Sequence, residues 1–283
     1  MHIDYWHATR NSFQGRLGGT VLGLVTLTAL CGPALLGTSP TAPSPAAFHP
    51  PSAAHPLGTN DFGQDLLAQL VHGARLSLVV AAGAGLLATL VGGLVGAAAG
   101  LARGWRDAVL MRLTDAVLAI PAVVVIIVIA AHLQLGPAGL TLVIALFGWP
   151  GTARVVRAQT LAVAGKAHIL AARTFGAPTW YILYRHLLPD LAPVLVVGFL
   201  RNARRAVFLE AGLAFLGIGD PTAVSWGAMI QGALRFFYLD AWIWWLLPPA
   251  LAIAAVILAF TLLGNVLEAL LDPRLKEVRQ QHA

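Results

Sequence analysis

The chain has 283 residues, of which 58% are hydrophobic and only 11% are charged, and its mean hydropathy is +0.77. A soluble domain carries about 25% charged residues. The composition therefore excludes an ordinary soluble enzyme and indicates an integral membrane protein. The net charge of +6 gives no support for nucleic-acid binding, because basic residues of membrane proteins gather in cytoplasmic loops. The single cysteine, Cys31, cannot form an internal disulfide and is expected to be inert packing.

The first 75 residues predict one membrane span between two polar segments. Residues 1–16 are expected to form a cytoplasmic N-terminus, and residues 17–37 an uncharged transmembrane helix of about the 20 residues that a span requires. A cleaved signal peptide is the alternative, although the apolar run is long for one. Residues 38–75 are rich in proline and predict an extended extracytoplasmic linker, which ends in a short amphipathic helix from Asp65.

Residues 76–271 predict a transmembrane domain of five further helices, and residues 272–283 a short cytoplasmic tail. No ten-residue segments alternate as a barrel would require, so we expect an all-α integral membrane fold with six transmembrane helices. Glycines spaced four apart in the second span indicate close helix packing, unless they only reflect a Gly- and Ala-rich composition. The five expected spans are about 76–101, 108–131, 139–163, 191–212 and 243–270, and the spaced glycines are Gly92, Gly96 and Gly100.

Basic residues predict which side of the membrane each loop faces. If the N-terminus is inside, only Arg75 and Arg235 fall on outer segments. Both termini and residues 165–190 are therefore expected to be cytoplasmic, and residues 213–242 to face outward. The twelve residues on inner segments are Arg10, Arg16, Arg103, Arg106, Arg154, Arg157, Lys166, Arg173, Arg185, Arg274, Lys276 and Arg279.

The stretch 165–190, GKAHILAARTFGAPTWYILYRHLLPD, is too short and too polar to span a membrane. Gly176 and Pro178 predict a break between two short helices, and Pro189 predicts a second break. Such helices can lie on lipid headgroups or dock on a soluble partner. The positions that can form an apolar stripe at helical spacing are Ala171, Ala172, Phe175, Ile182, Leu183 and Leu187.

No motif predicts catalysis by this chain. Gly165-Lys166 is followed by Ala167, and Thr160 stands where a phosphate-binding loop needs its first glycine. No HExxH motif or cysteine-based metal site is present in the sequence. We therefore expect no enzymatic activity, no cofactor and no metal site in this chain.

The stretch 165–190 resembles the coupling loop of ABC importer permeases. That pattern runs Glu-Ala-Ala, three residues, Gly, nine residues, Ile, one residue and Leu-Pro. The spacing matches throughout, with Leu170 where Glu is usual and His186 where Ile is usual. The missing acid puts the ionic part of docking in doubt, and a hydrophobic contact can replace it. The matching residues are Leu170, Ala171, Ala172, Gly176, His186, Leu188 and Pro189.

Further motifs between residues 55 and 276 are similar to the dipeptide, oligopeptide and nickel permease family. They occur before the second span, in an outer loop and at the C-terminal end. The resemblance implies a type I ABC importer permease fold. The motifs are His55-Pro56-Leu57-Gly58-Thr59 with Gly73-Ala74-Arg75, then Phe215-Leu216-Gly217-Ile218-Gly219 with Ser225-Trp226-Gly227, and Leu271-Asp272-Pro273-Arg274-Leu275.

The resemblance implies a multi-pass subunit of an ATP-driven importer that moves peptides across the cytoplasmic membrane of a bacterium or archaeon. Implied partners are a second permease chain forming a heterodimer, two ATPase subunits that carry ATP and Mg²⁺, and an external solute-binding protein. A nickel or metal-chelate importer is the alternative. A secondary transporter would need inverted repeats, which we do not find. A membrane scaffold without transport activity is the third class.

The fifth expected span carries unusual charge. Arg201, Arg204 and Arg205 share one helix face and lie roughly 15 Å into the span, at about 1.5 Å per residue. An arginine at that depth costs about 2.5–3.5 kcal/mol, so the three should face water or protein. This face can line the translocation pathway and attract an anionic group, or it can pair with Glu210 and with acids of the partner permease. The third possibility is that the span is wrongly placed.

The resemblance also implies that an outer segment contacts the solute-binding protein. The candidate contact residues are Asp220, Ser225 and Trp226. The alternative is a re-entrant or interfacial helix that an aromatic belt holds at the membrane surface.

Overall fold

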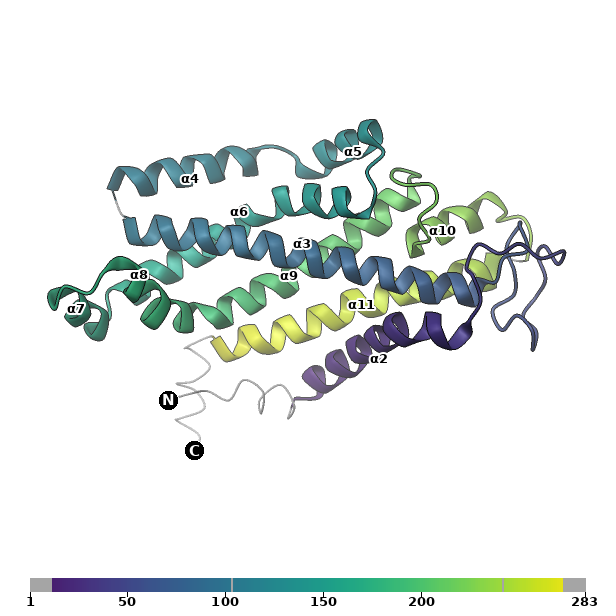
Figure 1. Cartoon of the computed structure of the whole chain (residues 1–283), viewed down its shortest axis with the longest axis horizontal. Helices are drawn as coiled ribbons and strands as arrows, with labels where there is room; N and C mark the ends of the chain where they lie inside the picture. Colours follow the sequence, from purple (N-terminus) through teal and green to yellow (C-terminus); the bar gives the residue numbers. More distant parts are fainter. Residues whose placement is uncertain (1–11, 103, 241, 272–283) are drawn as a thin grey trace.

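The computed structural model describes residues 12–102, 104–240 and 242–271, and this part of the chain consists of helices joined by turns and loops, with one isolated bridge between Thr59 and Asp65. Figure 1 shows an elongated bundle of long helices. The helices are α2 (Phe13–Leu36), α3 (Leu66–Ala102), α4 (Gly104–Ala119), α5 (Ala122–Leu133), α6 (Pro137–Ala164), α7 (Ala167–Thr174), α8 (Thr179–Ile182), the π-helix η1 (Leu183–Leu187), α9 (Leu188–Phe215), α10 (Trp226–Arg235) and α11 (Trp242–Leu271).

Five helical segments in the described ranges are long and apolar enough to cross a membrane, and a sixth is counted if α4 and α5 form one bent span. This confirms the expected all-α membrane fold. The expected span 108–131 differs from a single rod, because α4 and α5 meet at a bend of 71°. Pro121 lies at this break and disfavours helical backbone in the residue before it.

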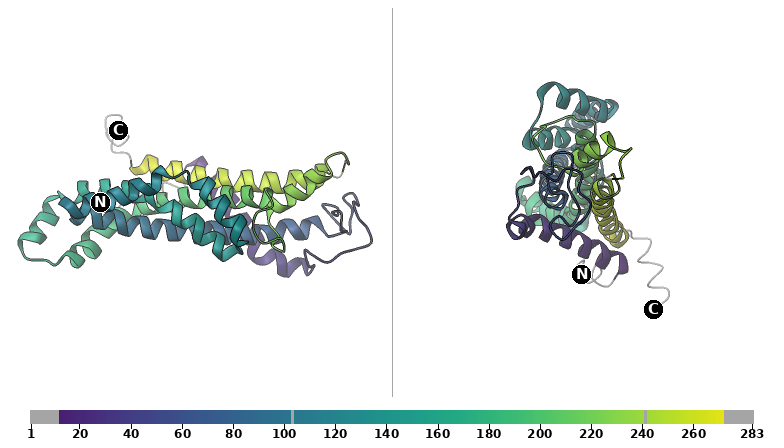
Figure 2. Two further views of the ribbon diagram at one scale, coloured as in Figure 1. Left: turned by 90° about the horizontal axis from the view of Figure 1, so that it is seen from above. Right: turned by 90° about the vertical axis from the view of Figure 1, so that its right-hand side faces the viewer.

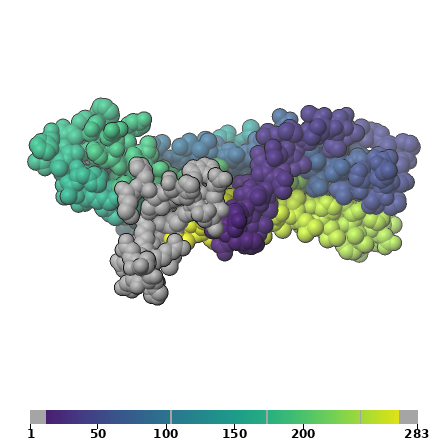
Figure 3. Space-filling view, turned by 90° about the horizontal axis from the view of Figure 1, so that it is seen from below, coloured from purple at the N-terminus to yellow at the C-terminus, as the bar shows by residue number. Residues whose placement is uncertain are grey.

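Consecutive long helices run in opposite directions. In Figure 1, α3 and α6 end, and α9 begins, at the end of the bundle that carries α7 and α8, which we call the loop end. We call the opposite end, with α10 and residues 38–65, the lobe end. Figures 2 and 3 show the same division from other sides, with the loop and the lobe at opposite extremes of the molecule.

Small residues bring α3 against α6 along its length. A Cβ atom on Gly92 would lie 2.5 Å from the backbone oxygen of Trp149, and one on Gly100 would lie 2.5 Å from the Thr160 side chain. A Cβ atom on Gly85 would lie 3.0 Å from the Cβ atom of Ala203 in α9. The spaced glycines therefore do permit close helix contact, which the sequence pattern alone left open.

Residues 38–65 differ most from expectation. Instead of an extended linker they form a folded segment, which we call the proline-rich lobe. Thr59 is fully buried and its backbone nitrogen donates to the His49 oxygen at 3.0 Å. The Phe48 ring packs edge-on against Phe236 at a centroid distance of 5.0 Å. Proline reduces the chain's freedom before folding, so less conformational entropy is lost when contacts such as these order the segment.

The short helix expected from Asp65 is the beginning of α3, which runs 37 residues without interruption. The Asp65 carboxylate accepts from the Ala68 nitrogen at 2.9 Å and contacts His55 Nδ1 at 2.8 Å. Asp65 therefore starts α3 and holds the lobe against it.

Candidate functional site

The stretch 165–190 forms the expected helical loop at the loop end. Its first helix, α7, ends before Gly176, which adopts a positive φ of 78° that glycine accepts without strain. The Ala177 nitrogen then donates to the Ala172 oxygen at 3.0 Å and turns the chain into α8. The second expected break is wrong, because residues 179–215 run as one helical segment through Pro189. Proline is tolerated in the first turn of a helix, and Pro189 lies in the first turn of α9.

The two sides of this loop differ sharply in burial. Ile169, Ile182 and Leu187 are buried against Val156 and Val163 of α6, and so fix the loop to the bundle. The outer side exposes large apolar and aromatic side chains. These are Leu170, Phe175, Trp180, Tyr181, Tyr184 and Leu188, and we call them the aromatic face.

Phe175 corrects the predicted apolar stripe, because its side chain is 89% exposed rather than buried with Ile182 and Leu187. Leu170, which replaces the usual acid, is 48% exposed and also lies on the aromatic face. His186 packs against the Tyr181 ring at a centroid distance of 5.6 Å. An exposed surface of this kind on a short loop favours a partner that supplies apolar burial.

An ion pair closes the base of the loop. Lys166 Nζ lies 2.6 Å from Asp190 Oδ2, and these residues stand before α7 and in the first turn of α9. Both side chains are partly exposed, so the pair contributes little to stability. It does fix where the two ends of the loop meet.

The three arginines of α9 line one open groove of about 580 Å³ between α6, α9 and α11. Arg201 pairs with Glu268 of α11 at 2.7 Å, and Arg204 donates to Thr261 Oγ1 at 3.2 Å. Arg205 is exposed and has no hydrogen bond or ion pair among residues 12–102, 104–240 and 242–271. The exposed ring of Phe208 lies in the same groove. An anionic group with an apolar part would suit this surface, because Arg205 can donate to an oxygen anion.

Glu210 does not belong to the groove. It is buried beneath the opposite side of α9, where the Ser77 hydroxyl donates to its carboxylate at 2.8 Å. Of the three groove arginines, Arg201 is the one that pairs with an acid within the described residues, and that acid is Glu268. The idea that Glu210 pairs with the arginines is therefore wrong, and Glu210 does not line their groove. Glu210 is five positions after Arg205, and this spacing turns the two side chains to different helix faces.

Asn202 lies beside the groove but points into the bundle. Its side-chain amide donates to Thr89 Oγ1 of α3 at 3.1 Å and to Thr152 Oγ1 of α6 at 3.0 Å. The three side chains are buried, so this small network ties the three central helices together.

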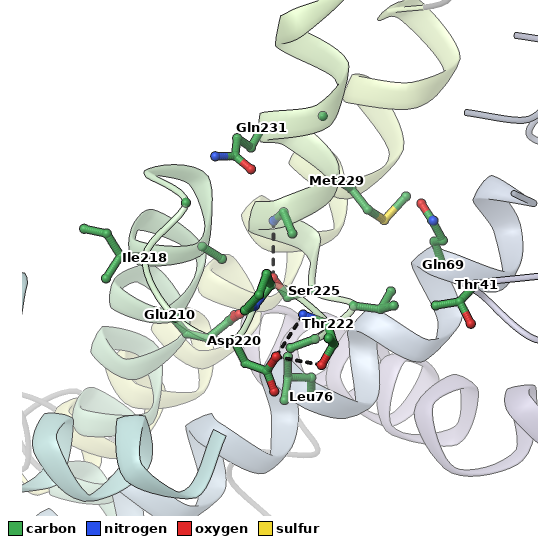
Figure 4. Close-up of a pocket in the computed structure, with 18 of the residues that line it drawn as sticks. Thr41, Gln69, Leu76, Glu210, Ile218, Asp220, Thr222, Ser225, Met229 and Gln231 are labelled. Carbon is green, nitrogen blue, oxygen red and sulfur yellow. Dashed lines mark hydrogen bonds between the residues drawn. The ribbon is translucent and has the colours of Figure 1, made fainter. Parts of the chain in front are cut away.

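At the lobe end, a cavity of about 620 Å³ lies between the proline-rich lobe, α3, α9, α10 and the loop before α10. Figure 4 shows Glu210 and Ser225 together at its wall, with Asp220 and Thr222 beside them. The Asp220 carboxylate accepts from the Thr222 nitrogen and hydroxyl, which holds the pKa of Asp220 below its usual value. Burial raises the pKa of Asp61 on the lobe side of the cavity.

The three candidates for contact with a binding protein are not equally accessible. Asp220 reaches the surface, whereas Ser225 and Trp226 are buried at 2% and 1% exposure. Ser225 and Trp226 therefore cannot touch a docked protein and instead hold α10 in place. Sequence reasoning missed the exposed aromatic side chains Phe62 and Tyr238 at this end. In the sequence, each is only a large apolar residue in a polar loop. Such residues are too common in a membrane protein to identify these two as a surface site.

Comparison with known proteins identifies the family of this chain. The family of binding-protein-dependent transport system inner membrane components matches residues 88–277. The chain belongs to this family. Such a permease is a multi-pass inner-membrane subunit without a catalytic site of its own, and it works with an ATPase and a solute-binding protein.

Individual relatives agree with this membership. The chain is 34% identical over 277 residues to a dipeptide transport system permease protein, DppC, of Bacillus subtilis, covering 96% of this chain and 86% of that one. It is 36% identical over 227 residues to the glutathione transport system permease protein GsiD of Pectobacterium atrosepticum, covering 80% and 75%. A solved structure of the inward-facing MetNI methionine ABC transporter matches with a TM-score of 0.58 at 18% identity, covering 71% of this chain and 95% of that one. This last match shows that the permease has an ABC importer fold.

Proposed function

We propose that this permease forms part of an ATP-driven importer that moves peptides across the cytoplasmic membrane of a bacterium or archaeon. The names of the dipeptide and glutathione permeases support peptides as the cargo. The groove beside Arg205 supports the same cargo, because a peptide offers both a carboxylate and apolar side chains.

One observation carries the coupling part of the proposal. The aromatic face lies on a loop that continues without a break into α9, and α9 carries the arginines of the groove. A protein that binds the loop can therefore move the wall of the groove. We propose that this protein is an ATPase subunit, that two such subunits hold the ATP and Mg²⁺, and that a second permease chain completes a heterodimer. This chain supplies no cofactor to the reaction.

The proposed orientation places the loop end and both termini in the cytoplasm and the lobe end outside. The excess of Lys and Arg on the inner segments supports it. The solute-binding protein would then dock on the lobe end, near Asp220.

Docking of the ATPase is proposed to rest on apolar burial rather than on an ion pair, because Leu170 occupies the position of the usual acid. Replacing Phe175 and Trp180 together with Ala should abolish copurification of the ATPase subunit at both low and high salt. The control is Leu94→Ala, which removes an exposed leucine of α3 away from the loop. ATPase binding that fails only at high salt would contradict apolar docking.

The groove is tested with Arg205→Gln. A hydrogen bond between charged partners is worth about 1.5–3 kcal/mol, so peptide affinity in transport should fall roughly 10- to 150-fold. The matched control is Arg112→Gln, which removes an exposed arginine of α4 outside the groove. If the Arg205 variant assembles and takes up every peptide as the parent does, Arg205 does not bind the cargo.

The whole assignment is tested by uptake in a strain that lacks this chain. A labelled dipeptide, a labelled pentapeptide and chelated nickel are compared. Loss of peptide uptake alone is the expected result. Loss of nickel uptake alone would assign the permease to a metal-chelate importer and refute the peptide proposal. No loss of any of the three would leave the family membership standing and show that the proposed cargo is wrong.

A further inference from the structure

Glu210 is the most deeply buried acid of the described ranges and takes no part in the groove or the loop. It joins three separate segments of the chain. Ser77 of α3 donates to it at 2.8 Å, and Figure 4 shows the Ser225 side chain, just before α10, beside the same carboxylate. A carboxylate can accept about four hydrogen bonds, so one side chain of α9 can hold both α3 and the start of α10.

Ser225 also makes a hydrogen bond that can be separated from its place beside Glu210. Its hydroxyl oxygen accepts from the Ala228 nitrogen at 3.2 Å and so caps the N-terminus of α10. A serine hydroxyl has one donor and two acceptor positions, so it can donate to Glu210 while it accepts from Ala228. Removing the Glu210 carboxylate would therefore remove its link to the start of α10 but leave the cap of α10 intact.

The start of α10 is also packed directly against both long helices. Trp226 Nε1 donates to the Leu70 oxygen of α3 at 2.9 Å. Gly227 lies against the backbone oxygen of Ala211 in α9, where a Cβ atom would have no room. These segments are in direct contact, with no space between them. A shift of α10 therefore moves α9 as long as the link through Glu210 holds.

The other end of α9 is the loop that carries the aromatic face. The 28 residues of α9 span roughly 42 Å at about 1.5 Å per residue. Glu210 lies near the C-terminal end of α9, and the loop that carries the aromatic face precedes the other end of this helix. The rod therefore connects the outer surface around α10 with the surface on which an ATPase would dock.

We propose that Glu210 is a positioning residue that ties the outer docking surface to α9, so that arrival of the solute-binding protein is transmitted to the ATPase. This inference rests on the proposed function and adds to it the residue through which the two ends communicate. The tie is made by the hydrogen bond from Ser77 and by the Ser225 hydroxyl beside the same carboxylate, and it requires no contact between Glu210 and cargo.

The test uses the complete importer reconstituted in lipid nanodiscs. ATP hydrolysis is measured with and without peptide-loaded solute-binding protein. Glu210→Ala should keep assembly and the basal rate within about twofold of the parent, while stimulation by the binding protein falls at least fivefold. Ser77→Ala should lose part of the stimulation. Glu210→Gln, which keeps an oxygen acceptor for the serines, should restore most of it.

The matched control is Thr114→Val, which removes a fully buried hydroxyl of α4 that bonds only within its own helix. It should leave stimulation unchanged. Full stimulation of the Glu210→Ala importer would overturn this inference and leave the proposed function standing. If that variant does not assemble, full stimulation of the Ser77→Ala importer would overturn it equally. If the parent importer is not stimulated by any peptide-loaded binding protein, the proposed function fails and the inference falls with it.

Discussion

The contact of α3 with α6 allows a sharp prediction at Gly92. In Gly92→Ala the new Cβ atom would lie 2.5 Å from the Trp149 oxygen and 2.7 Å from Thr152 Cβ, against at least 3.4 Å in an ordinary contact. Both neighbours belong to the body of α6, so the helices must separate by nearly 1 Å. Overpacking of this kind costs about 1–3 kcal/mol. The variant should therefore be less stable, even though alanine is the better helix former.

The assay is thermal unfolding of the purified importer in detergent, with Gly151→Ala as the control. Gly151 lies on α6 with nothing within 4 Å of its Cβ position, so alanine there should be neutral or stabilising by up to about 1 kcal/mol. At roughly 2–4 °C per kcal/mol, Gly92→Ala should lower the midpoint by about 2–12 °C. Equal midpoints for the two variants would show that α3 and α6 do not approach as closely as described.

Three smaller effects follow from other contacts. Lys166→Ala should lower the free energy of unfolding by less than about 1 kcal/mol, and high salt should remove the difference, because the pair with Asp190 is partly exposed. A loss of stability that does not depend on salt would contradict this. The pKa of Asp220 is lowered in the folded state, so the stabilisation by its carboxylate is present above the unfolded pKa and is lost as pH falls through the folded pKa. The difference in melting temperature between the parent and Asp220→Asn should therefore shrink from pH 7 to about pH 3. A constant difference would contradict this. Phe48→Ala should speed proteolysis of the lobe at residues 38–65, and an unchanged cleavage rate would mean that this ring does not hold the lobe.

Patterns that depend on neighbouring positions in the sequence proved reliable. The apolar runs located the long helices, because twenty apolar residues leave a membrane chain no other way to satisfy its backbone. Gly176 located the turn between the short helices, because the turn needs a positive φ. The spacing of Arg201, Arg204 and Arg205 placed all three in one groove, because a helix face is fixed by sequence separation alone.

Patterns that depend on distant partners were unreliable. Glu210 looked like a counter-charge for the arginines, yet its partner Ser77 lies 133 positions earlier in the chain. Ser225 and Trp226 looked like surface contacts, yet they are buried at the start of α10. The proline-rich lobe looked extended, because the contact that folds it, with Phe236, comes from the other end of the sequence.

The sequence by itself thus determined a membrane protein of long helices, the loop with its two short helices, and the row of arginines on α9. These follow from composition and from the period of a helix, which need no knowledge of packing. Only the tertiary structure decided which side chains face outward on the loop, which acid balances which arginine, and that Glu210 joins α3, α9 and α10. Those properties depend on which helices become neighbours, and a uniformly apolar chain leaves that choice to close packing of small residues and to a few buried hydrogen bonds.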